Sequence, residues 1–129
     1  MNASDAHLNL VFAWLWILAG FVSGMIMGLK FQNERWLGGY TSFKRRMFRL
    51  GHISFFGLGA INLFFYLSLK DAALSSAGVA ASRAFILGGI SMPICCCLMA
   101  CTAKAQPLFA IPVISLISAA VLTLLQITI

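Results

Sequence analysis

Four long runs of apolar residues, none of which contains Asp, Glu, Lys or Arg, dominate this chain. They cover approximately residues 8–29, 52–69, 84–103 and 108–129. Roughly 20 helical residues cross the ~30 Å hydrocarbon core of a bilayer. Because backbone groups must be paired inside lipid and no run alternates in polarity, each run is predicted to be a helix. We therefore predict an all-α membrane protein with four transmembrane helices in an antiparallel bundle.

Composition points to the same fold class. Of the 129 residues, 61% are hydrophobic and only 9% are charged, whereas a soluble domain carries roughly 25% charged residues. The polar side chains are too few to cover a surface that faces water, so the lipid bilayer is expected to surround most of the molecule. The short length predicts that residues 1–129 form a single four-helix transmembrane domain.

The basic residues are concentrated in one connection. Six of the nine lie between Lys30 and Arg49, where Glu34 is the only acid. The positive-inside rule places segment 30–51 in the cytoplasm and both termini outside, and the expected location is a bacterial inner membrane. The net charge of +6 is therefore expected to contact anionic lipid and not nucleic acid. The residues predicted to bind lipid headgroups are Lys44, Arg45, Arg46 and Arg49.

Residues 42–50 have a helical pattern of their own. Phe43, Met47 and Leu50 would share one face of a helix, and the basic side chains lie largely away from that face. Such a short amphipathic helix could lie on the inner leaflet and run into the second span. Thr41 or Ser42 is expected to cap its start. The alternative is a solvated basic loop without regular structure.

Small and polar residues inside the spans are candidates for helix packing. Gly20, Gly24 and Gly28 recur every four residues and therefore lie on one face of the first span. A stripe of this kind lets two helices approach closely, and the partner could be a helix of the same chain or of another subunit. Asn62, in the second span, is expected to form a hydrogen bond between helices, worth about 1 kcal/mol.

The third span carries four cysteines close to Pro93. Cys97 and Cys101 lie one helical turn apart, and Met25 and Met27 of the first span are predicted at a similar depth. Thiolate and thioether ligands suit Cu(I), so a metal site is one hypothesis. Packing of the cysteines as small apolar side chains is the favoured one, because no histidine lies near them in the sequence.

Two histidines raise the question of haem. His7 precedes the first span and His52 opens the second, so the predicted topology separates them by nearly a membrane thickness. They cannot both ligate one haem within one subunit. His52 alone could bind haem or another pigment with a further ligand from a partner. The alternative is that His52 anchors the helix at the interface and that the chain has no cofactor.

The sequence shows no arrangement of residues typical of a catalytic centre, and an enzyme is not expected. Its acids, Asp5, Glu34 and Asp71, all lie outside the spans or at their ends. We therefore expect an accessory, structural or assembly subunit of a larger inner-membrane complex, in contact with other membrane subunits. Two alternatives stay open: a haem- or pigment-binding electron-transfer subunit that uses His52, and a small oligomeric transporter or channel.

Overall fold

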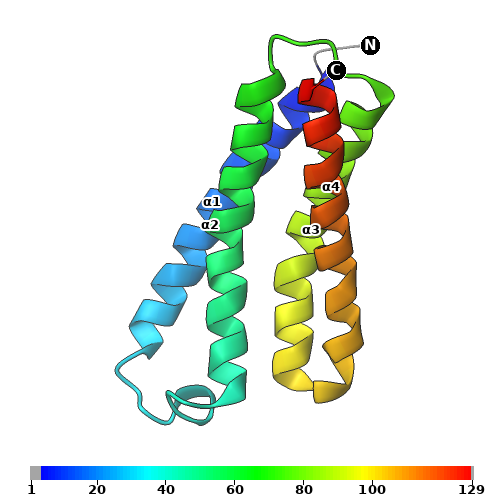
Figure 1. The fold of residues 1–129 in the computed structure, drawn as a ribbon. Helices are drawn as coiled ribbons and strands as arrows, with labels where there is room; N and C mark the ends of the chain where they lie inside the picture. Colours follow the sequence, from blue (N-terminus) through cyan, green and yellow to red (C-terminus); the bar gives the residue numbers. More distant parts are fainter. Residues whose placement is uncertain (1–3, 129) are drawn as a thin grey trace.

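The computed structural model describes residues 4–128 and contains four long helices (Figure 1). They are α1 (Ser4–Lys30), α2 (Phe43–Leu69), α3 (Ser76–Cys101) and α4 (Ala110–Thr128). Short 3-10 helices, η1 (Trp36–Gly38) and η2 (Ala103–Phe109), lie in the first and third connections. No strand occurs between residues 4 and 128. Helices α1 to α3, and η2 together with α4, are each long and apolar enough to cross a membrane, which confirms the predicted fold class.

Successive helices run in opposite directions (Figure 1). One end of the bundle holds the start of α1, the end of α4 and the connection 70–75, and we call it the termini end. The other end holds the connection 31–42 and η2, and we call it the basic end. The two histidines therefore lie towards opposite ends, since His7 lies in the first turn of α1 and His52 in the first turns of α2.

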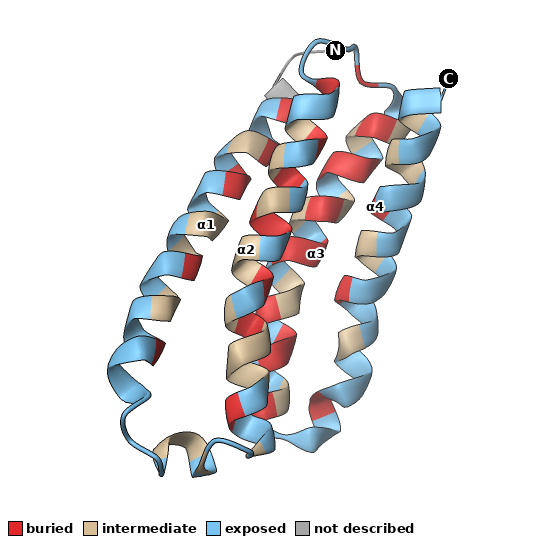
Figure 2. Cartoon of the chain, turned by 60° about the vertical axis from the view of Figure 1, so that its left-hand side comes forward, coloured by how far each residue is buried: buried red, intermediate tan, exposed pale blue. Residues whose placement is uncertain are grey.

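The four helices form a row and not a closed square. α2 and α3 pack against each other, with α1 on α2 and α4 on α3, and α1 and α3 make a smaller contact across the row. α1 and α4 thus stand at the two edges, and their outward faces are exposed along most of their length (Figure 2). Between 17% and 33% of the most apolar stretch of each span is buried within the chain, which leaves lipid to cover the rest.

Helices α2 and α3 begin well before the apolar runs that they contain. α2 starts at Phe43, where Ser42 Oγ accepts a hydrogen bond from the backbone N–H of Arg45 (3.1 Å). The predicted amphipathic segment is therefore helical, is capped by Ser42 and continues into the second span without a break. α3 starts at Ser76 and not near residue 84, because Ser75 caps it and the Ala-rich stretch that follows favours helix.

All four helices meet in a hydrophobic core towards the termini end. Its buried members are Ala6, Phe65, Leu69, Leu74, Ala81, Phe85 and Ala119. At the same end, Gln126 Oε1 accepts hydrogen bonds from the backbone N–H (2.9 Å) and the Oγ (2.5 Å) of Ser75. This contact ties the last turns of α4 to the capping residue of α3.

Three buried polar side chains join α1, α2 and α3. Asn9 Nδ2 donates to Asn62 Oδ1 (2.7 Å), and Ser82 Oγ donates to Asn9 Oδ1 (2.5 Å). Asn62 Nδ2 also donates to the carbonyl of Leu58 in its own helix (2.8 Å). Asn9 and Asn62 are both fully buried. The hydrogen bond expected of Asn62 is thus made with Asn9, a partner that the sequence did not indicate.

A proline in α3 provides a second polar link to α1. Pro93 has no N–H, so the carbonyl of Gly89, four residues earlier, lacks its usual helical donor. The indole N–H of Trp16 donates to that carbonyl (3.0 Å). The Trp16 ring is stacked on Phe12, with the ring centroids 4.2 Å apart. The broken helical bond in α3 is thereby replaced by a bond between helices.

Candidate functional site

A cavity of about 250 Å³ next to His52, in the half of the bundle towards the basic end, is the candidate functional site. It brings together donor side chains from α1, α2 and α3, whereas the rest of its lining is almost entirely apolar. The lining residues are Ser23, Ile26, Met27, Trp36, Phe48, Gly51, His52, Phe55, Pro93 and Cys97.

The close approach of α2 and α3 brings His52 and Cys97 to the same cavity. A Cβ atom on Gly51 would lie 3.3 Å from the Cβ of Cys96, which is tighter than most contacts between side chains. The neighbours of these two residues, His52 and Cys97, line the same cavity, together with Met27 of α1. The sequence showed no histidine close to the cysteines, whereas the fold brings His52 to a cavity that Cys97 also lines.

The imidazole of His52 is oriented by α1. Its Nδ1 lies 2.9 Å from Ser23 Oγ, and Ser23 Oγ lies 3.0 Å from the carbonyl of Gly20, to which it donates. Because a hydroxyl has one proton, the Ser23 oxygen then accepts from His52, and we assign the imidazole proton to Nδ1. The lone pair is left on Nε2, the nitrogen that would ligate a metal or accept a hydrogen bond from a ligand.

Two of the three candidate packing glycines face this part of α2. A Cβ atom on Gly20 would lie 2.8 Å from the ring of Phe56, and one on Gly24 would lie 2.9 Å from Cε1 of His52. Gly28 has no atom within 4 Å of such a position among residues 4–128. The glycines thus differ in role: Gly20 and Gly24 make room for aromatic rings, whereas no side chain of the described residues lies against Gly28.

The cysteines divide into two pairs. Cys95 and Cys96 are buried, and the Cys95 thiol lies 3.4 Å from the carbonyl of Leu108. Cys97 and Cys101 are exposed and both line a second cavity, of about 460 Å³, which shares Phe55, Pro93 and Cys97 with the first. Within the described part of the chain, no three His, Cys, Asp or Glu side chains are close enough to hold a metal ion.

The four residues predicted to bind headgroups lie in different environments. Lys44 and Arg46 are exposed and Arg49 is half-buried. Arg45, by contrast, is only 3% exposed, because its guanidinium lies against aromatic rings of the preceding connection. The sequence pattern did not predict this burial.

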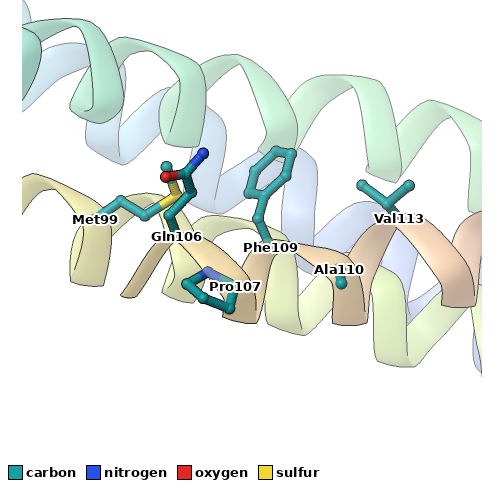
Figure 3. Close-up of a pocket in the computed structure, with 6 residues that line it drawn as sticks. All are labelled: Met99, Gln106, Pro107, Phe109, Ala110 and Val113. Atoms are coloured by element: carbon teal, nitrogen blue, oxygen red, sulfur yellow. The ribbon is translucent and has the colours of Figure 1, made fainter. Parts of the chain in front are cut away.

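A further cavity, of about 510 Å³, lies where α3 passes into α4. Its lining residues are Met99, Gln106, Pro107, Phe109, Ala110 and Val113. Gln106, Phe109 and Val113 project to one side of this connection, and Met99 of α3 approaches Gln106 (Figure 3). These lining residues include no ionisable side chain, so the cavity offers a surface for apolar packing and no group for acid–base catalysis.

Comparison with protein-family models, with curated proteins and with solved structures finds no match to this chain. The function must therefore be argued from the geometry of the molecule itself.

Proposed function

We propose that this chain is an accessory, structural or assembly subunit of a larger complex in a bacterial inner membrane, with its basic end in the cytoplasm. The observation that carries the proposal is an exposed stripe along α1. Its members recur with the alternating spacing of three and four residues that a helix pair requires. They are Leu8, Val11, Leu15, Leu18, Val22, Met25 and Leu29, each between 46% and 77% exposed.

This stripe is suited to a second helix. It runs the length of an edge helix and consists of leucine and valine side chains and Met25. Helix pairing within a membrane depends on close side-chain packing, because lipid tails are as apolar as the helix surface. A regular heptad face extending from Leu8 to Leu29 offers such packing to a transmembrane helix of another subunit.

Extraction from the native membrane in mild detergent tests this proposal. We expect the chain to migrate with at least one other membrane protein in a constant ratio, measured by quantitative mass spectrometry. Replacing Leu15, Leu18 and Val22 together by Ala should release the partner. The matched control replaces Ile114, Ile117 and Val121, which are similarly exposed on α4. A chain that migrates alone, or equal loss in both triple variants, would contradict the proposal.

A second candidate function rests on the geometry of His52: a haem- or pigment-binding electron-transfer subunit. Ser23 orients the imidazole and leaves the lone pair on Nε2, and two adjoining apolar cavities lie between α1, α2 and α3. A second histidine ligand would come from a partner subunit, since His7 lies at the termini end.

A visible absorption spectrum of the natively purified protein, before and after reduction with dithionite, tests this candidate. We expect a band that disappears in His52→Ala and persists in His7→Ala, the matched control. Ser23→Ala should retain the bound haem or pigment but shift its absorption band. The hydrogen bond to Nδ1 influences how strongly the His52 imidazole binds as a ligand. A spectrum without any band would refute the candidate.

A further inference from the structure

Arg45 is the most deeply buried charged side chain whose burial the structure describes. Only 3% of its surface is exposed, and its Nε is buried without a hydrogen-bond acceptor. The cost of removing a charge from water is normally offset by a counter-charge or by hydrogen bonds. Within residues 4–128, none of the guanidinium N–H groups of Arg45 donates to the protein.

Aromatic rings surround this guanidinium and hold it in place. The Cζ atom of Arg45 lies 5.2 Å from the ring centroid of Phe31, 5.5 Å from that of Trp36 and 5.3 Å from that of Tyr40. Cation–π contacts stabilise the positive charge but accept no N–H bond. The cage therefore fixes the position of Arg45 and supplies no acceptor for its N–H donors.

A second arginine shares one of these rings. The Cζ atom of Arg49 lies 4.7 Å from the ring centroid of Tyr40. Two like charges on one ring repel each other unless an anion lies near both. The only acid in segment 30–51, Glu34, is exposed and forms no ion pair with them, since Lys70–Asp71 is the one ion pair found in the described part of the chain.

We propose that Arg45 and Arg49 bind the phosphate group of an anionic phospholipid at the basic end. Phosphate accepts paired hydrogen bonds from the planar guanidinium fork, and it would supply the missing counter-charge. This inference does not depend on the partner subunit or on a ligand at His52.

The surroundings of the cage favour a lipid over free phosphate. Phe31 of the cage is 44% exposed, and Leu29 and Phe43, two positions before Phe31 and Arg45 in the sequence, are 77% and 44% exposed. Apolar surface for acyl chains is therefore present at this end of the bundle. Trp36 and Tyr40 are residue types enriched at the boundary between hydrocarbon and headgroups. An ion without an acyl chain would use only the arginine part of this surface.

Native mass spectrometry of the detergent-solubilised full chain tests the proposal, with phosphatidylglycerol, phosphatidylcholine and inorganic phosphate offered at equal concentrations. We expect the wild type to retain phosphatidylglycerol. Arg45→Met should lower its apparent affinity at least about tenfold. Arg35→Met is the matched control, because Arg35 is an exposed arginine of the same connection and its loss removes the same charge.

Two further variants keep the test decisive if Arg45→Met does not fold. Arg45→Lys retains the charge but loses the planar fork, and Arg49→Gln removes only the second arginine, so both should weaken phosphatidylglycerol binding. Equal retention of the two lipids, equal loss in Arg35→Met, or unchanged binding in Arg45→Lys and Arg49→Gln would overturn the proposal. Inorganic phosphate bound as strongly as phosphatidylglycerol would overturn its assignment to a lipid.

Discussion

Replacing Asn9 by Leu is expected to lower the free energy of unfolding by about 2 kcal/mol. The change removes the donor to Asn62 and the acceptor for Ser82 at once, and it leaves a buried amide oxygen on Asn62 without its partner from α1. Bonds of this kind between membrane helices are worth about 0.6–2 kcal/mol, and the unpaired group adds to the loss. Titration of the purified protein with SDS, followed by circular dichroism, measures the effect.

The comparison with Asn62→Leu shows whether the two amides act together. Because they bond to each other, the double variant should lose much less stability than the two single losses combined. Ser91→Ala serves as control, since Ser91 bonds only to carbonyls of its own helix, Leu87 and Gly88. Additive losses, or a loss in Ser91→Ala as large as that in Asn9→Leu, would contradict a shared network between helices.

Gly24→Val is expected to destabilise the protein by about 1–3 kcal/mol, the usual cost of overpacking. The added Cβ would lie 2.9 Å from Cε1 of the His52 imidazole, and the adjoining Nδ1 is held by the Ser23 hydroxyl. Either the ring must turn away from Ser23 or α1 must move away from α2. The same SDS titration gives the loss of stability.

Gly28→Val is the matched control on the same helix face. No atom of the described residues lies within 4 Å of the added Cβ, so stability should change by less than about 0.5 kcal/mol. If the two variants behave alike, the glycine stripe packs against something other than α2, such as a helix of another subunit.

The sequence predicted the fold well because hydrocarbon imposes few alternatives. Runs of about 20 apolar residues must be helical, and their short connections make neighbours antiparallel. The apolar run of the third span begins near residue 84, whereas α3 itself begins at Ser76, because Ser75 caps its first turn. The third connection is likewise no simple four-residue turn but the 3-10 helix η2, which includes Pro107.

The candidate site depends on contacts that no local pattern encodes. Asn9 lies near the start of the first span, where a polar residue is common and indicates no partner. Only the register of α1 against α2 brings it to Asn62. The burial of Arg45 depends on the path of the connection, which turns through positive φ angles at Leu37, Gly38 and Gly39. One signal was available: Ser23, a hydroxyl on the glycine-rich side of α1, marked the face that holds His52.

The hydrogen bonds of the first helix also constrain how the chain is assembled during synthesis. Asn9 and Trp16 enter the membrane first, yet their partners Ser82 and Gly89 belong to the third helix. A nascent chain with two helices inserted would hold an indole N–H in hydrocarbon without an acceptor. The hairpin of α1 and α2 therefore lacks hydrogen-bond partners that α3 supplies. When α3 inserts, the carbonyl of Gly89, which Pro93 leaves without a helical donor, accepts the N–H of Trp16.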